Sequence, residues 1–264
     1  MAELCTAQGQ AGVCLGDWLQ LAPMLVPASV DFCYADPPFN TGEAKATPPN
    51  ALRAGREVAT AYCDRWGSTT DYMEWLRGRV GATLPALKPT GVLAIHCDWR
   101  TSHHVRLMLD ELMGEANFVN QLVWRYGLGG SSPRRFARKH DDVIVYAMDV
   151  ERYFFEPPMV AATSQRMRGR MKKSTDVLDV PSLNNMARER TGYPTQKPVA
   201  LLELLVGAFA PAGGLVLDPC CGSGTTLVAA KGLGRRAIGF DMNPRAVELA
   251  RKRLGEQVEP LAEA

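Results

Sequence analysis

The fold of this chain is decided by the stretch GLVLDPCCGSGTTLVAA, residues 214–230. It begins with a short apolar run that ends in Asp218, which predicts a buried strand. A Gly-x-Gly turn follows, and an apolar segment of helical character comes after it. Glycines let a backbone approach a ligand closely, and the next helix offers free N–H groups at its N-terminus. The stretch therefore predicts a strand–turn–helix unit that binds a nucleotide-like ligand.

A second strand is predicted directly downstream, and it also ends in an acid, Asp241. An acid at this place can accept hydrogen bonds from both hydroxyls of a ribose. Leu227 occupies the position where a dinucleotide-binding fingerprint has its third glycine. With Asp218 before the turn, this favours a ligand that has a cationic amino group and no pyrophosphate. S-adenosylmethionine (SAM) fits, and a turn that binds nothing is the less favoured alternative.

The remainder of the chain alternates strands with helices. The strands are nearly continuous apolar runs, and the helices carry apolar residues at helical spacing. This alternation predicts an α/β fold built on a doubly wound, mostly parallel sheet, whose ligands bind at the carboxyl ends of the strands. The predicted strands are 13–15, 30–35, 91–97, 118–124, 142–148, 214–218 and 236–241, and the predicted helices are 18–25, 72–87, 102–113, 198–209, 227–233 and 244–254.

Composition excludes several classes of protein. The chain has 264 residues, of which 46% are hydrophobic and 22% charged, as in ordinary globular domains. Seven cysteines without a repeating spacing, and four histidines, argue against a disulfide framework or a metal site. We expect reduced thiols and a cytoplasmic location, since the sequence has neither a signal-peptide pattern nor an apolar run that could span a membrane.

The second informative motif is Asp36-Pro37-Pro38-Phe39, at the end of the predicted strand 30–35. Proline has no N–H to donate, so strand pairing must stop there, and the backbone is stiff. The motif thus sets two acceptors, the Asp36 carboxylate and the Pro37 carbonyl, beside the ring of Phe39. Such an edge suits a planar group with an NH2, for instance a nucleobase. A strand end with a core phenylalanine is the competing interpretation.

Two further regions lack a regular period. Residues 40–70 are rich in Gly, Pro, Thr and Ala, which predicts a mobile loop that closes over a substrate. Residues 125–190 hold 13 Lys and Arg against 8 Asp and Glu, whereas the remainder holds 17 against 20. A solvated surface is the alternative, but two clusters favour contacts with the phosphates of a polyanion. The cations predicted to contact these phosphates are Arg134, Arg135, Arg138, Lys139, Arg166, Arg168, Arg170, Lys172 and Lys173.

These motifs, in this order and together with the turn Pro194-Thr-Gln-Lys-Pro198, resemble the beta group of DNA amino-methyltransferases. In that group the catalytic motif precedes the SAM motif, a circular permutation of the usual class I methyltransferase order, and the likeness covers nearly the whole chain. It implies a catalytic part at 1–126, an inserted target-recognition region at 127–190 that includes one core strand, and a SAM-binding part at 191–264.

The resemblance also implies roles for single residues. Asp36, Pro37, Pro38 and Phe39 would hold and stack the target base. The cofactor SAM would be bound by Asp17, Thr195, Gln196, Lys197, Asp218, Cys220, Gly222, Ser223, Gly224, Thr225 and Asp241. No metal is expected, and no cysteine needs to act as a nucleophile.

The implied reaction is methylation of the N6 of a flipped-out adenine in double-stranded DNA. The family uses Asp-Pro-Pro-aromatic motifs mostly for adenine, whereas cytosine N4 remains the alternative because both bases present an amino group. Less favoured are a Rossmann oxidoreductase and a non-catalytic DNA-binding module. A homodimer and a cognate restriction enzyme are further possible partners.

Overall fold

The structure is a computed structural model, and it describes residues 11–46, 60–127, 131–162, 164–184 and 187–256. Its centre is a sheet with the order β1-β12-β11-β2-β5-β7-β6-β10. Neighbouring strands run parallel, except that β7 is antiparallel to both β5 and β6. The strands are β1 Ala11–Leu15, β2 Val30–Ala35, β5 Leu87–Cys97, β6 Phe118–Arg125, β7 His140–Ala147, β10 Val177–Asp179, β11 Leu215–Asp218 and β12 Arg236–Asp241. The predicted α/β, mostly parallel sheet is confirmed.

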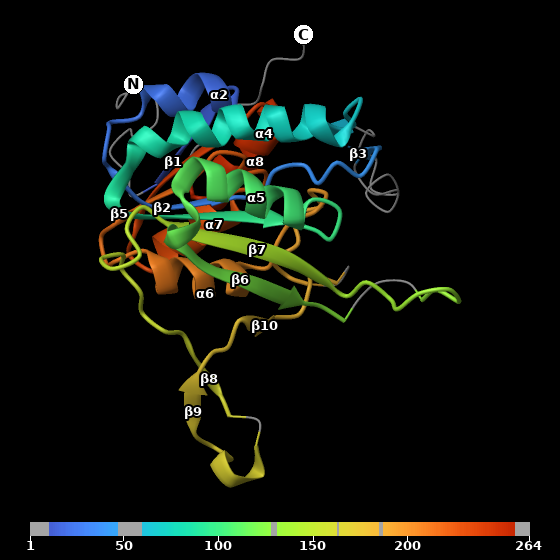
Figure 1. Ribbon diagram of the computed structural model, residues 1–264, viewed down its shortest axis with the longest axis vertical. Helices are drawn as coiled ribbons and strands as arrows, with labels where there is room; N and C mark the ends of the chain where they lie inside the picture. Colours follow the sequence, from blue (N-terminus) through green and yellow to red (C-terminus); the bar gives the residue numbers. More distant parts are fainter. Residues whose placement is uncertain (1–10, 47–59, 128–130, 163, 185–186, 257–264) are drawn as a thin grey trace.

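Helices cover both faces of this sheet (Figure 1). One face packs against α2 (Trp18–Leu21), α4 (Thr69–Thr83) and α5 (Ser102–Met113). The other packs against α6 (Val199–Phe209), α7 (Thr225–Gly232) and α8 (Pro244–Arg253). Because both faces are buried, the central strands are mostly apolar, and β2 and β11 are buried along their whole length. Short 3-10 turns lie at Ala22–Met24, Leu84–Ala86, Glu115–Asn117 and Gln165–Met167.

The order of the strands reverses between β11 and β2. From β11 the sheet continues to β12 and β1 on one side, and from β2 it continues to β5 and β7 on the other. In open α/β sheets a crevice forms at the carboxyl ends of strands where the order reverses. β11 ends in Asp218 and β2 is followed by Asp36, so the two predicted motifs meet at this crevice.

The structure corrects the prediction for residues 40–70. Their base is an antiparallel hairpin of β3 (Glu43–Ala46) and β4 (Thr60–Asp64), and residues 47–59 lie outside the described part. The buried Asp64 carboxylate holds the base together, since it accepts from the Asn40 N–H at 2.7 Å and the Thr41 hydroxyl at 2.5 Å. The prediction of an irregular segment is therefore wrong for residues 43–46 and 60–64, which are strands. Closure over a substrate stays a prediction.

The structure also differs from the prediction at the ends of several elements and in one additional strand. The helix predicted to reach residue 87 ends at Thr83, because Pro85 lies in a 3-10 turn, and β5 begins at Leu87. The predicted recognition region contributes not only β7 but also β10, a short edge strand that pairs with β6. Its hairpin of β8 (Met159–Ala161) and β9 (Met171–Lys173) projects from the body at the bottom of Figure 1.

The cysteines fit the expected reduced thiols with one exception. Cys33, Cys63, Cys97, Cys220 and Cys221 are free. Cys14 is disulfide-bonded, so the expectation of seven reduced thiols is wrong there.

Among the described helices, none has the length and apolar character needed to cross a membrane.

Candidate active site

A cavity of about 620 Å³ opens at the carboxyl ends of β11 and β2. Its volume lies in the range typical of small-molecule sites. One part is lined by the glycine turn after β11 and by Asp241, and the other by the motif after β2. The two predicted halves of the site thus share one cavity. The predicted residues that line it are Asp17, Asp36, Pro37, Pro38, Phe39, Thr195, Gln196, Lys197, Asp218, Cys220, Gly222, Ser223, Thr225 and Asp241.

Gly222 forms the floor of the turn. Its φ of 50° favours glycine, and a Cβ there would lie 3.0 Å from the ring of Tyr193. The Gly222 N–H donates to the Asp241 carboxylate at 2.8 Å, which ties the turn to the end of β12. Burial raises the pKa of Asp241, although the N–H groups of Asn243 and Gly222 oppose this. Gly222 thus lets the Tyr193 ring pack against the turn, and both residues line the cavity beside the Asp241 carboxylate.

Gly224 has a different role from the predicted one. It does not line the cavity, and it precedes α7 with a φ of 75°. A Cβ there would lie 2.7 Å from the Cβ of Ala250, so this glycine lets α7 approach α8. A dinucleotide fingerprint would have a glycine at position 227, where this chain has Leu227. Here the glycine is on the strand instead: Gly239 of β12 has no side chain, and the Leu227 side chain packs into that space. Close helix–strand packing is thus achieved without the third glycine.

Asp218 is almost completely buried beneath the turn. Burial raises its pKa to about 7, while hydrogen bonds from the Thr226 hydroxyl and the Cys220 N–H oppose the change. The nearby Asp36 and Asp241 raise it further. A buried carboxylate without an internal cation suits a ligand that brings a positive charge.

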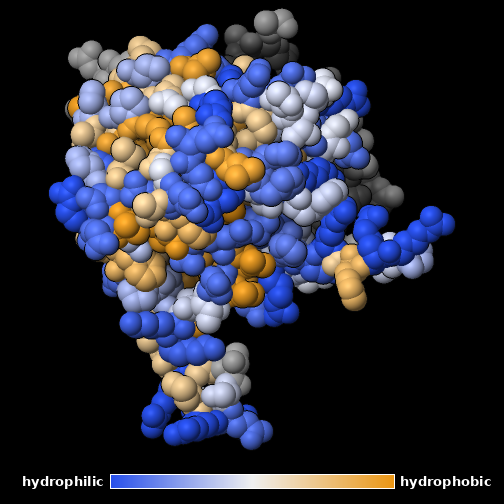
Figure 2. All heavy atoms as spheres, viewed as in Figure 1, coloured by the Kyte–Doolittle hydropathy of each residue, from blue (hydrophilic) through white to orange (hydrophobic). Residues whose placement is uncertain are grey.

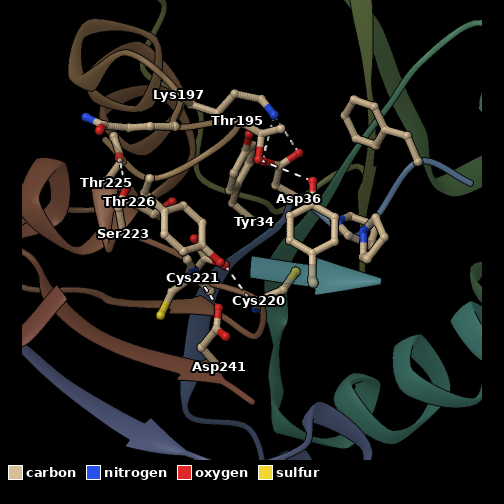
Figure 3. Close-up of a pocket in the computed structure, with 18 of the residues that line it drawn as sticks. Tyr34, Asp36, Thr195, Lys197, Cys220, Cys221, Ser223, Thr225, Thr226 and Asp241 are labelled. Carbon is tan, nitrogen blue, oxygen red and sulfur yellow. Dashed lines mark hydrogen bonds and ion pairs between the residues drawn. The ribbon is translucent and has the colours of Figure 1, made fainter. Parts of the chain in front are cut away.

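Asp36 has an internal cation that sequence reasoning did not pair with it. The Lys197 ammonium lies 2.8 Å and 2.7 Å from its two carboxylate oxygens, as the dashed lines in Figure 3 mark. It also lies 5.0 Å from the centroid of the Phe39 ring. Lys197 was predicted to contact the cofactor, but here its ammonium holds the carboxylate of the base-binding motif. Nothing in the local sequence of either residue signals this pairing.

Phe39 rests on a buried polar network. Its ring stacks on His96 at 5.6 Å between centroids, and His96 is fully buried. The two nitrogens of His96 contact the Tyr34 hydroxyl at 2.7 Å and the Asp141 carboxylate at 3.3 Å. Asp141 also accepts from the Tyr126 hydroxyl at 3.0 Å. The network fixes the ring's underside, so the other side can receive a planar group.

Burial acts to raise the pKa of Asp141, but His96, Lys197 and Tyr126 lower it overall. Asp141 and Tyr126 both line the cavity, and neither was predicted as a site residue. Tyr126 follows the end of β6, and Asp141 lies at the beginning of β7, both at the crevice. This position can be recognised only once the strand order is known.

The turn before α6 closes one side of the cavity. Thr195 adopts a φ of 59°, which is strained for a β-branched residue and is a feature of functional sites. Its hydroxyl lies 3.3 Å from that of Tyr62 on β4. Gln196 mainly braces the turn, because its side chain accepts from Thr191 and donates to the Glu189 carbonyl.

Asp17 caps α2 through the Leu19 N–H, as the simple structural interpretation requires, and it also forms an ion pair with Arg79 at 2.6 Å. It still lines the cavity. Its carboxylate is therefore already engaged on two sides, and Arg79 is a cation of the cavity wall that was not predicted.

The predicted DNA-binding residues lie outside the cavity on two projections. The basic arm, residues 131–139, joins β6 to β7, and the basic hairpin consists of β8, β9 and the residues between them. Figure 2 shows that hydrophilic side chains cover most of both projections. Arg134, Arg135 and Arg138 are exposed on the arm, and the hairpin carries Arg166, Arg168, Arg170, Lys172 and Lys173.

Comparison with known proteins is consistent with this geometry. A family model described as DNA methylase, of the N6/N4 type, matches residues 30–252. The chain belongs to the N6/N4 DNA methylase family. The match covers the Asp36-Pro37-Pro38-Phe39 motif and the glycine turn, and methylases of this family use SAM as methyl donor.

Individual relatives agree with the family. The Type II methyltransferase M.ScaI of Streptomyces caespitosus is 30% identical over 93% of this methylase and 82% of its own length. M.HpaI of Haemophilus parainfluenzae is 27% identical over 87% of this methylase and 69% of its own length.

Two crystal structures share the fold of this methylase. The M1.HpyAVI–SAM complex has a TM-score of 0.60, with 22% identity over 92% of this chain and 98% of that one. PvuII DNA methyltransferase, which is cytosine-N4-specific, has a TM-score of 0.66, with 16% identity over 92% and 85%. The class I methyltransferase fold is therefore confirmed.

The residues present in the cavity fit the cofactor of this family. The turn at Gly222 and Ser223, which lines the cavity, would receive the methionine part, and the buried Asp218 offers a partner for its ammonium. Asp241, at the end of β12, can accept from ribose hydroxyls with the lone pairs that Gly222 and Asn243 leave free. Two cations of the cavity lining, Arg79 and Lys197, are balanced by Asp17 and Asp36.

Proposed function

We propose that this DNA methyltransferase methylates the exocyclic N6 of an adenine that is flipped out of double-stranded DNA. One observation carries the proposal: the Asp36 carboxylate, beside Phe39, opens into the same cavity as the glycine turn and Asp218. An amino group bound at Asp36 and a methyl donor bound at the turn would therefore meet inside one cavity.

The chemistry of an exocyclic amine explains why acceptors are needed. Its lone pair is delocalised into the ring, so it is a weak nucleophile. Acceptors on its hydrogens, here the Asp36 carboxylate and the Pro37 carbonyl, favour a lone pair directed out of the ring plane. They also stabilise the positive charge that develops on nitrogen during transfer, so the catalysis is positional and electrostatic.

Lys197 acts as a positioning residue in this proposal. It contacts both oxygens of Asp36, and an ionised carboxylate has further lone pairs with which to accept from the amine. No covalent intermediate is needed. Burial raises the pKa of the Cys220 and Cys221 thiols well above the ordinary value, which keeps them unreactive.

Cytosine N4 is the second candidate. PvuII DNA methyltransferase, which shares the fold, is cytosine-N4-specific, and a cytosine also presents an amino group. Adenine is favoured because an acid begins the motif at Asp36, where family members that modify cytosine mostly have serine.

The test is incubation with labelled SAM and plasmid DNA, followed by nucleoside analysis and mapping of the modified sites. Label in N6-methyladenine supports the proposal, whereas label in N4-methylcytosine supports the second candidate. Asp36→Ala should abolish methyl transfer. If this variant kept full methyl transfer, the assigned role of the carboxylate would be overturned.

Double-stranded DNA would be held by the cations of the basic arm and the basic hairpin. We also propose that the protein forms a homodimer and has a cognate restriction enzyme, the latter suggested by the Type II relatives. Light scattering of the purified protein tests the first, and cleavage protection of the mapped sites tests the second.

A further inference from the structure

The basic arm carries one large apolar side chain among its cations. Phe136 is 98% exposed, and Arg134, Arg135 and Arg138 beside it are exposed as well. Phenylalanine is usually at least partly buried, because its ring has a large apolar surface. A fully exposed ring between guanidinium groups would be covered if the arm bound a partner that offers both phosphates and flat apolar faces.

The arm begins and ends at the rim of the cavity. The Tyr126 N–H donates to the Lys139 carbonyl at 2.9 Å and closes the base of the arm. Tyr126, just before the arm, and Asp141, just after it, both line the cavity. In Figure 1 the arm extends away from the body beyond the ends of β6 and β7. A duplex that delivers a base to the cavity would therefore meet the arm.

A stacked pair of side chains ties the arm to the segment that follows β5, next to Asp98 of the cavity lining. The Arg138 guanidinium lies 3.2 Å from the centroid of the Trp99 ring, and that of Arg100 lies 4.9 Å from it. Arg100 is also paired with Asp98, which lines the cavity. Phe136 lies two residues from this anchor, so its position is coupled to the cavity.

We propose that Phe136 inserts into the base stack of the duplex, beside the nucleotide whose base enters the cavity. This inference rests on the proposed function. The neighbouring arginines would hold phosphates on either side, while the ring replaces the stacking that the departing base gives up. Extrusion of a base costs unstacking energy, and an inserted ring offsets part of it.

The experiment compares the wild type with Phe136→Ala, Phe136→Trp and, as matched control, Leu107→Ala. Leu107 is 61% exposed on α5 and lies outside the arm and the cavity. Methyl transfer is measured on a duplex that contains a mapped site, either fully paired or mismatched at the target base. Affinity for an intact duplex and for one with an abasic site is measured by fluorescence anisotropy, a readout that requires no methyl transfer.

We expect Phe136→Ala to lose roughly 10- to 100-fold in rate on the paired duplex, and to recover to within about threefold of the wild type on the mismatched one. Phe136→Trp and Leu107→Ala should keep the wild-type rate. The wild type should favour the abasic duplex, where the ring finds an empty place, and Phe136→Ala should lose this preference.

Unchanged transfer and unchanged preference in Phe136→Ala would overturn the insertion. An equal loss on paired and mismatched duplexes would also overturn it, because a general binding role would then suffice. If the wild type transferred no methyl group to any DNA, the proposed function would fail. The abasic preference would still decide the role of Phe136.

Discussion

Replacement of Asp218 by asparagine should stabilise the protein in the absence of ligand. Burial raises the pKa of this carboxyl from 3.8 to about 7. Each pKa unit corresponds to about 1.36 kcal/mol, so the ionised Asp218 destabilises the folded state by roughly 4 kcal/mol. Asparagine has nearly the same shape, keeps an acceptor for the Cys220 N–H, and carries no charge.

The pH dependence follows from the sign of the shift. The folded state holds a proton on Asp218 that the unfolded chain has already released above its pKa of 3.8. Wild-type stability therefore falls from about pH 4 to about pH 7, and the asparagine variant lacks this fall. Between about pH 5 and pH 8 the advantage of the variant should grow by roughly 2 to 3 kcal/mol.

Thermal unfolding followed by fluorescence measures the effect, and roughly 5 to 10 °C of additional stabilisation is expected across that pH interval. Asp31→Asn is the control. Asp31 is also buried, but it is paired with Lys88 at 2.7 Å and accepts from the Leu215 N–H, so its replacement should destabilise. A constant difference between wild type and Asp218→Asn at all pH values would refute the reasoning. Calorimetry should also show that Asp218→Asn no longer binds SAM.

Three other predictions concern stability and binding. Lys197→Met should lower the free energy of unfolding by about 2 to 3 kcal/mol, because it leaves the Asp36 carboxylate unpaired. The double variant with Asp36→Asn should lose less stability than the sum of the two single variants, and additive losses in urea unfolding would contradict the ion pair. Gly224→Ala should lower the free energy of unfolding by about 2 to 3 kcal/mol in the same assay. Adding Ala250→Gly should restore only the stability lost through the clash with the Ala250 Cβ. Full restoration would mean that the positive φ of residue 224 carries no cost. Alanine at the five cations of the basic hairpin should reduce the salt dependence of duplex binding, with the slope of log Kd against log salt falling by roughly 0.9 per lost phosphate contact; an unchanged slope in anisotropy titrations would remove the hairpin from the interface. These five are Arg166, Arg168, Arg170, Lys172 and Lys173.

The sequence predicted those parts of the fold and site that depend on local pattern. Continuous apolar runs predicted the buried strands, and the acid at the end of each of two strands predicted where ligands meet them. The rule that ligands bind at the carboxyl ends of strands then brought Asp36 and Asp218 into one site. The predicted strands and the shared cavity of Asp36 and Asp218 agree with the structure, because period, turn chemistry and strand direction are local or obey general topological rules.

The parts that escaped prediction depend on side chains that meet across the fold. Lys197 reaches Asp36 from a turn far along the chain, and its neighbours in sequence suggest only a turn near the cofactor. His96 lies within an apolar strand, where a buried histidine is unremarkable until Phe39 and Asp141 are seen around it. A glycine in a Gly-x-Gly turn can serve the ligand or helix packing, and the contact of Gly224 with Ala250 shows a packing role that the sequence did not reveal.

The charges of the cavity link cofactor binding to the state of its acids. Asp36 and Asp241 both raise the pKa of Asp218, and among these three only Asp36 has an ammonium partner, Lys197. A cationic ligand relieves this repulsion, so we expect it to bind as Asp218 releases its proton, and more tightly as the pH rises through about 7. The product of methyl transfer from SAM has lost the sulfonium charge. The same carboxylates therefore hold the product less tightly than the donor, which favours its release after each transfer.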